Sequence, residues 1–275
     1  MTNGTDAPAR LAVRGLAAGY PGRRVIDGLD LEFAPGRITM VIGANACGKS
    51  TLLSTLARVL PPQEGQVELD DADIAGLSRR TFARSVGLLP QHPSAPDGLT
   101  VAELVSRGRH PHRGVFQRWS ATDTARVDDA MARTGVSALA ERPVGDLSGG
   151  QRQRVWIAMA LAQEPRVLLL DEPTTFLDLS HQIEVLDLLR ELNRSDGTTI
   201  VAVLHELNLA ARYADDLIVM CDGRVVAHGA PSEVLTAEVV AAAFDLEALV
   251  IPDPLTHTPL VIPVPGGAHA PADED

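Results

Sequence analysis

The chain has 275 residues, of which 45% are apolar and 22% charged, the composition of an ordinary globular protein that can bury a sizeable core. Its 24 basic and 36 acidic side chains give a formal net charge of −12, which repels a polyanion and argues against nucleic acid as the main partner. Two cysteines are too few for a disulfide framework, and neither an apolar run of roughly 18 residues nor a signal-peptide core is present, so we expect a cytoplasmic chain that acts at a membrane only through a partner.

Three short strands and a helix frame the first motif of the chain. Leu11 to Leu16, Leu29 to Phe33 and Ile38 to Ile42 are apolar or alternating runs that Gly and Pro residues separate, which is typical of strands. The third run leads into Gly43-Ala44-Asn45-Ala46-Cys47-Gly48-Lys49-Ser50-Thr51, and a helix-favouring stretch continues to Arg58. Strand, glycine loop and helix in this order are the context in which proteins bind nucleotide phosphates.

The residue types of this loop suit a phosphate ligand. Gly43 and Gly48 permit backbone angles and a close approach that a Cβ would forbid, so that successive N–H groups can point at phosphate oxygens. We expect Lys49 to reach the β and γ phosphates and the Ser50 hydroxyl to hold Mg²⁺. The loop therefore predicts a nucleoside triphosphate site, and a plain glycine turn with a surface lysine is the alternative. Cys47 is either a small filling residue or a thiol whose pKa the helix N-terminus lowers.

The middle of the chain changes from strands to helices. Gln66 to Leu69 and Val86 to Leu89 have the composition of strands, whereas helical periodicity dominates from about Thr100 to Arg142. Its clearest apolar runs are Val101 to Val105 and Val127 to Met131. We interpret about residues 95–160 as a helical subdomain that is inserted into an α/β core.

A basic island lies in this helical part, composed of Arg107, Arg109, His110, His112, Arg113 and Arg118. In an acidic protein such a cluster could dock another subunit, and a solvated surface is the equal alternative. Ser120 followed by Asp123 resembles a capping box, which predicts the start of a helix at that point.

The α/β core resumes with two continuous apolar runs. Val167 to Leu170 ends in Asp171 and Glu172, and Thr199 to Leu204 ends in His205. Such runs are typical of central parallel strands, whose carboxyl ends are where open α/β sheets place ligands. At such a position Asp171 can help to hold Mg²⁺, and Glu172 can polarise a water molecule. His205 can donate a hydrogen bond to the γ-phosphate. Taken singly, the acidic pair could instead cap a helix, and the histidine could be an ordinary core or surface residue.

The last part of the chain contains a turn signal and a proline-rich tail. Met220 to Arg224 includes Asp-Gly, which predicts a hairpin turn. The tail beyond Pro252 has five more prolines and an acidic end, so we expect it to be extended and partly disordered. We predict one domain over residues 9–245 and a C-terminal extension over residues 246–275.

A second anion site is expected about 100 residues after the first. The signature segment, Leu147-Ser148-Gly149-Gly150-Gln151, begins a helix that continues from Arg152 to Gln163, so a hydroxyl and two glycines lie at a helix N-terminus. One nucleotide does not readily need two complete phosphate cradles. We infer that the second cradle caps the γ-phosphate of a nucleotide that another copy of the chain holds.

The chain carries, in this order, the motifs GANACGKS (43–50), LSGGQ (147–151), VLLLDEP (167–173) and VLH (203–205). Together they make it strongly resemble the ATP-binding subunit of ABC transporters. The resemblance implies a P-loop NTPase core with a mainly parallel sheet, an N-terminal antiparallel β subdomain and an inserted helical subdomain. It also implies ATP and Mg²⁺ as cofactors, and hydrolysis of ATP by a head-to-tail dimer that encloses two nucleotides.

The resemblance assigns roles to individual residues. Tyr20 matches the aromatic side chain that stacks on adenine, Gln91 matches a glutamine that touches Mg²⁺ and the attacking water, and Asp178 falls in the D-loop, where Phe176 replaces the small residue of many members. By position, the catalytic residues would be Lys49, Gln91, Glu172 and His205, and the metal ligands Ser50, Gln91 and Asp171. The nucleotide-binding residues would be Tyr20, Gly43, Ala44, Asn45, Ala46, Cys47, Gly48, Lys49, Ser50, Thr51, Ser148, Gly149, Gly150, Gln151 and Asp178.

Within that family, the stretches 151–162, 173–182 and 204–215 are similar to ferric-siderophore importers, as are Gly108 to His112 and Ile251 to Pro254. This similarity implies bacterial iron uptake. The partners would be transmembrane permease subunits and, indirectly, an external substrate-binding protein, and the chain would lie at the cytoplasmic face of the inner or plasma membrane.

Three alternatives stay open at this point. The same ATPase could serve cobalamin, haem or another metal chelate. A soluble ABC ATPase of translation or DNA repair is expected to have two cassettes in one chain, a coiled-coil insertion or basic surfaces. The sequence has none of these features. A scaffold that senses nucleotide without hydrolysis would not need Glu172 and His205.

In a transporter, Gln91 to Arg113 would form the groove that receives a cytoplasmic helix of the permease, and closure of the dimer would move the helical subdomain.

Overall fold

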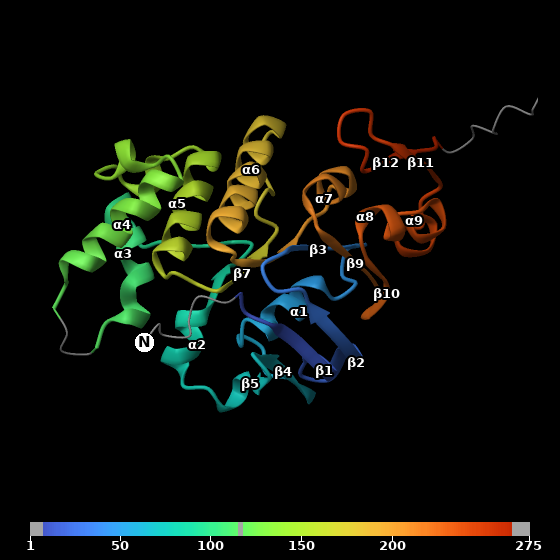
Figure 1. Cartoon of the computed structure of the whole chain (residues 1–275), viewed down its shortest axis with the longest axis horizontal. Coiled ribbons are helices and arrows are strands. Elements are labelled where there is room, and N and C mark those ends of the chain that lie inside the picture. The colour runs from blue at the N-terminus through green and yellow to red at the C-terminus, as the bar shows by residue number, and fades with distance from the viewer. Residues whose placement is uncertain (1–7, 115–117, 266–275) are drawn as a thin grey trace, which may run out of the picture.

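A six-stranded sheet forms the centre of the computed structural model, which describes residues 8–114 and 118–265 (Figure 1). Its strand order is β10-β9-β3-β8-β7-β6. All neighbours run parallel except the edge strand β10. The strands are β3 (Ile38–Gly43), β6 (Val86–Leu89), β7 (Val167–Asp171), β8 (Thr199–Val203), β9 (Asp216–Cys221) and β10 (Arg224–Gly229). The two apolar runs that predicted central parallel strands are β7 and β8, which confirms that prediction.

A second, antiparallel sheet packs beside the first in the order β2-β1-β4-β5. Its strands are β1 (Leu11–Tyr20), β2 (Arg23–Phe33), β4 (Glu64–Leu69) and β5 (Ala72–Asp73). One apolar cluster joins both sheets to helix α1 (Lys49–Leu56), whose Leu52, Leu53 and Leu56 are almost fully buried. The loop that precedes α1 therefore leads into a helix that packs against both sheets.

The helical subdomain lies at the side of the core (Figure 1). It contains α3 (Val101–Ser106), α4 (Ala121–Arg133) and α5 (Gly149–Ala162), and the short α2 (Arg79–Ser85) precedes β6. Ser120 and Asp123 form the capping box of α4, as predicted. The helices pack through Val105, Val127 and Val155, all of which belong to the main apolar core. The subdomain is thus continuous with the central sheet.

The basic island proves to be only partly a surface feature. Arg107, His110 and Arg118 are exposed. Arg109 is only 4% exposed, because it forms ion pairs with two carboxylates: its Nε lies 3.1 Å from Asp123 and its Nη1 lies 2.7 Å from Glu164. The expectation of a docking or solvated residue at Arg109 was wrong, since a paired guanidinium can be buried.

The C-terminal third continues with α6 (Leu179–Asp196), α7 (Leu207–Tyr213), α8 (Pro231–Val234) and α9 (Ala237–Phe244). The predicted hairpin turn at Asp222-Gly223 joins β9 to β10. Gly223 is required there, because a Cβ would lie 1.9 Å from the carbonyl oxygen of Val25. Over the residues that the structure describes, no helix combines the length and apolarity that a membrane crossing requires.

The start of the proline-rich tail forms a hairpin of extended strands, which the sequence analysis did not predict. Strands β11 (Ala248–Pro252) and β12 (Pro259–Pro263) form an antiparallel hairpin. Asp253 holds its turn by accepting hydrogen bonds from the backbone N–H groups of Leu255 and Thr256, at 2.8 and 3.0 Å. The Asn208 side chain of α7 pairs with both backbone groups of Val261, which docks the hairpin on the core. The prediction of disorder also covers residues 266–275, which lie outside the described residues.

Candidate functional site

The phosphate loop joins the carboxyl end of β3 to the start of α1, as the motif predicted. Gly43 has φ +153°, and a Cβ there would lie 2.2 Å from the Met220 carbonyl oxygen of β9. Gly48 has φ +111° and begins α1 in a left-handed conformation. Both positions therefore require glycine. Ala46 adopts φ +61° despite its Cβ, which costs on the order of 1–2 kcal/mol and leaves this turn strained.

Lys49 is buried at the base of the loop, with 5% of its surface exposed. Its Nζ donates hydrogen bonds to the carbonyl oxygens of Gly43 and Ala44, both at 2.9 Å. The ammonium is thereby held inside the curve of the loop, while Asn45 and Ala46 are exposed at its rim. A phosphate placed in the loop would meet this fixed positive charge and the first N–H groups of α1.

Cys47 fills space within the loop. It is 5% exposed, and its Sγ would lie 2.7 Å from a Cβ at Gly43. Burial raises the pKa of its thiol more than the nearby Lys49 charge lowers it. Of the two interpretations of Cys47, the structure favours the small filling residue, because burial, which the sequence does not show, outweighs the helix N-terminus.

Ser50 and Asp171 meet where α1 begins and β7 ends. The Ser50 hydroxyl donates to Oδ1 of Asp171 at 3.2 Å. Burial raises the pKa of Asp171, and the hydrogen bond from Ser50 partly opposes that shift. A hydroxyl beside a half-buried carboxylate supplies two hard oxygen ligands, the donor type that Mg²⁺ prefers, so these residues fit a bound Mg²⁺.

Glu172 lies at the centre of a cluster of polar side chains. Its Oε2 accepts hydrogen bonds from Gln91 Nε2 at 2.5 Å and Thr175 Oγ1 at 2.9 Å, and its Oε1 lies 2.6 Å from His205 Nε2. Burial alone would raise the pKa of Glu172, but the bonds from His205, Thr175 and Gln91 together lower it. The carboxylate is therefore ionised at neutral pH and can accept a proton.

Three strands and a turn bring this cluster together. Gln91 follows β6, Glu172 follows β7 and His205 follows β8, and these strands are adjacent and parallel. Their carboxyl ends meet at one edge of the sheet, as the sequence predicted. Thr175 was missed by sequence reasoning. Its contact with Glu172 could have been predicted from its position three residues further along the chain, because a turn there brings the two residues together.

The signature segment caps α5. Ser148 Oγ accepts from the Gln151 backbone N–H at 3.3 Å, and the Ser148 N–H donates to Gln151 Oε1 at 3.2 Å. Ser148 and Gly149 are exposed, whereas Gly150 is buried. Among the described residues, no hydrogen bond joins residues 148–151 to the phosphate loop at 43–51. Within one chain, the two cradles therefore remain separate.

Two further predicted residues lie on the surface. Tyr20 ends β1 and is 51% exposed, so its ring is accessible for stacking. Asp178 caps α6, and hydrogen bonds from the backbone N–H and the ring of His181 lower the pKa of Asp178 to about 2.

The predicted residue Thr51, in contrast, is buried in the first turn of α1, where its carbonyl accepts a hydrogen bond from the Thr55 hydroxyl.

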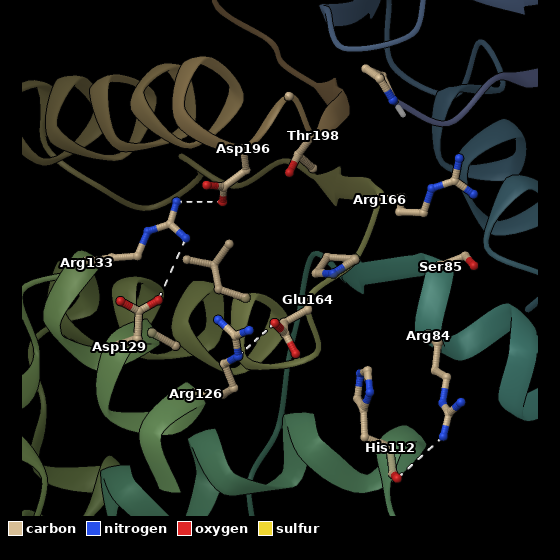
Figure 2. Close-up of a pocket in the computed structure, with 15 residues that line it drawn as sticks. Arg84, Ser85, His112, Arg126, Asp129, Arg133, Glu164, Arg166, Asp196 and Thr198 are labelled. Carbon is tan, nitrogen blue, oxygen red and sulfur yellow. Dashed lines mark hydrogen bonds and ion pairs between the residues drawn. The ribbon is translucent and has the colours of Figure 1, made fainter. Parts of the chain in front are cut away.

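A cavity of about 570 Å³ lies elsewhere, between the helical subdomain and the amino ends of β6, β7 and β8 (Figure 2). Several of its charged side chains are already paired within the chain. Arg133 lies 2.6 Å from Asp196, and Arg126 lies 2.9 Å from Glu164. None of the predicted site residues lines this cavity.

A family model described as ABC transporter matches residues 26–175, more than half of the chain. The chain belongs to the ABC transporter family. The match begins in β2 and ends at Thr175, so it contains the phosphate loop, the signature segment and the Glu172 cluster except His205. This ABC protein is therefore an ATPase, as the motifs predicted.

Curated relatives match this ABC ATPase over nearly its whole length. The achromobactin transport ATP-binding protein CbrD of Dickeya dadantii is 54% identical over 250 residues, which cover 91% of this chain and 93% of that protein. The ferric enterobactin transport ATP-binding protein FepC of Escherichia coli is 50% identical over 260 residues, which cover 94% of this chain and 96% of that protein.

Solved structures confirm the predicted ABC ATPase fold. One, described as an inward-facing conformation of an ABC transporter, has a TM-score of 0.81 at 30% identity and covers 94% of this chain and 98% of that chain. A dimeric structure of the bacterial ABC transporter cassette MJ0796 has a TM-score of 0.71 at 27% identity and covers 80% of this chain and 98% of that chain.

Proposed function

We propose that this ABC ATPase powers a bacterial importer of ferric siderophores. It would work as a dimer on the cytoplasmic face of the membrane, bound to permease subunits that receive cargo from an external binding protein. The observation that carries the proposal is that relatives with 50–54% identity across nine-tenths of the chain are siderophore transport ATP-binding proteins. The residues that the motifs assign to hydrolysis, Lys49, Glu172 and His205 among them, are also present in this chain.

The residues of one chain would bind the phosphates and direct the water. The loop N–H groups and Lys49 would hold the β and γ phosphates, with Tyr20 against the adenine. Ser50 and Asp171 would hold Mg²⁺, which when bound supplies positive charge to the phosphate oxygens. Glu172 would take the proton of the attacking water.

The neighbours of Glu172 would orient and stabilise the reacting groups. Gln91 already donates to Glu172, so its amide would lie close enough to orient the attacking water. His205 lies 2.6 Å from the same carboxylate. Once nucleotide is present, His205 would donate instead to the γ-phosphate and stabilise the charge that develops there. The glutamine and the histidine thus approach the catalytic carboxylate from two sides.

The site would be completed by a second copy of the chain. The exposed Ser148 and Gly149 offer a hydroxyl and N–H groups at the start of α5, and these bond to no part of their own phosphate loop. In a head-to-tail dimer they would face the γ-phosphate held by the partner chain. Each chain would then bind one nucleotide and cap the other.

Replacing Ser148 with Arg is expected to block dimer closure without weakening ATP binding to the monomer. The long cationic side chain would occupy the space of the partner's γ-phosphate and would remove the capping hydroxyl. Titration with a fluorescent ATP analogue measures monomer binding, and sedimentation with ATP measures dimerisation. Ser137→Arg, in the turn after α4, is a control for an added surface charge. Tight ATP-dependent dimers of Ser148→Arg would contradict the two-chain site.

The cargo is tested in a strain that lacks the gene for this chain. We expect the strain to lose uptake of iron-loaded siderophore and to regain it with the wild-type chain, but not with Glu172→Gln. The wild-type chain should also co-purify with its permease subunits. Normal siderophore uptake together with lost cobalamin or haem uptake would instead assign one of those chelates as the cargo.

A further inference from the structure

We propose that His181 is a positioning residue that joins Asp178 to the signature segment of its own chain. The two groups offered to the partner's nucleotide would then move as one rigid unit. This inference rests on the proposed two-chain site and adds to it a side chain that contacts no nucleotide.

The first half of this joint is a cluster of hydrogen bonds on one oxygen. Oδ1 of Asp178 lies 3.0 Å from the His181 backbone N, 2.6 Å from His181 Nδ1 and 2.8 Å from Ser180 Oγ. An ionised carboxylate only accepts hydrogen bonds, so Nδ1 of His181 carries the proton. The imidazole is thereby tied to Asp178, and its other edge is turned away from the carboxylate.

The second half is a contact between this ring and Gly150. A Cβ at Gly150 would lie 2.4 Å from Cδ2, 2.9 Å from Cγ and 3.2 Å from Nε2 of His181. The imidazole thus packs directly against the Gly150 backbone, in space that any other residue would occupy. Beside it, a Cβ at Gly149 would meet Leu177 Cδ2 at 3.5 Å. A glycine at position 150 therefore leaves room for the histidine ring of the same chain, and a larger residue would force that ring to shift.

The segment that ends at His181 begins at the catalytic carboxylate. Thr175 donates to Glu172, and the Leu177 carbonyl accepts from Gln182 Nε2 at 3.2 Å, so the segment is bonded at both ends. It therefore runs from the chain's own site to the groups that face the partner's nucleotide. Loss of the His181 contacts should loosen the partner-directed groups and leave the phosphate loop unchanged.

The test uses full-length chains with Glu172→Gln, in which ATP should trap the dimer. We expect His181→Ala to raise the dimer dissociation constant about tenfold, the effect of losing roughly one hydrogen bond to a charged group. Binding of a fluorescent ATP analogue to the monomer should not change. In the assembled transporter with an intact Glu172, kcat should fall about tenfold, whereas KM should stay within about twofold. His181→Asn keeps a donor near Asp178 and should recover most of both losses.

Glu184→Ala is the matched control. It removes the 3.3 Å ion pair with Arg154, which links α5 and α6 but touches neither Asp178 nor the signature segment. A merely structural role for His181 predicts that His181→Ala and Glu184→Ala lower the melting temperature alike and leave dimerisation and kcat unchanged, and that result would overturn the proposal. Failure of His181→Asn to recover activity would overturn it as well. If the variant that carries only Glu172→Gln forms no ATP-dependent dimer, the proposed two-chain site itself is wrong.

Discussion

Replacing Glu172 with Gln is expected to slow ATP hydrolysis by the assembled transporter by a factor on the order of 10²–10⁴, the usual contribution of a general base. The amide has nearly the shape of the carboxylate and keeps an oxygen that can accept from Thr175 or Gln91, so the fold should be retained. It cannot take a proton from water. ATP should still bind, and the dimer that it closes should persist because the nucleotide is not consumed.

Phosphate release measures the turnover of Glu172→Gln, and sedimentation with and without ATP measures its dimer. Glu184→Gln is a control, because it makes the same chemical change at a half-exposed carboxylate whose ion pair is with Arg154. It should hydrolyse ATP at the wild-type rate. Turnover by Glu172→Gln at that rate would remove Glu172 from the mechanism and leave the base to be found elsewhere.

Replacing Lys49 with Ala is expected to weaken nucleotide binding by about two orders of magnitude. Removing one partner of a buried, hydrogen-bonded charge pair typically costs about 2–5 kcal/mol, and each 1.4 kcal/mol corresponds to about tenfold in affinity. Lys49 is the buried cation of the loop, and its removal also leaves the Gly43 and Ala44 carbonyls without their donor. The defect should therefore appear in the binding step itself.

Equilibrium titration of the monomer with a fluorescent ATP analogue measures the effect of Lys49→Ala. Arg133→Ala is the control, because it also removes one cation but does so in the cavity of Figure 2, where Arg133 pairs with Asp196. The control should bind nucleotide as the wild type does. Unchanged affinity in Lys49→Ala, with the control also unchanged, would contradict the assignment of the loop as the phosphate site.

The local patterns of the sequence predicted the parts of the fold that local physics decides. The phosphate loop was predictable, because the spacing of its glycines is a local motif, and Gly43 and Gly48 adopt φ values of +153° and +111° that favour glycine. The parallel strands β7 and β8 were predictable from continuous apolar runs. The hairpin of β11 and β12 was missed, because its prolines pair at the strand ends and its turn depends on Asp253.

The side-chain environments that the sequence did not reveal depend on contacts between distant parts of the chain. Arg109 is buried because Asp123 and Glu164 approach it from two other segments. The pKa of Cys47 follows its burial, which no local pattern reveals. The role of His181 became visible only when the structure placed its ring against Gly150. The residues assigned to the ATP site come from motifs that can be read in the sequence, and that assignment stays a prediction, whereas the contacts that support these residues are visible only in the structure.

The two hydrogen bonds from the Lys49 ammonium to backbone carbonyls can be followed by experiment. Lys49 is the single lysine of the 275-residue chain, because every other basic side chain except histidine is arginine. Labelling lysine alone with ¹⁵N would give one side-chain amine resonance from the entire protein. That resonance would come from the ammonium now held by Gly43 and Ala44. Each change of its partners, from backbone carbonyls to incoming anions and back, could then be followed by NMR in the unmodified, full-size transporter.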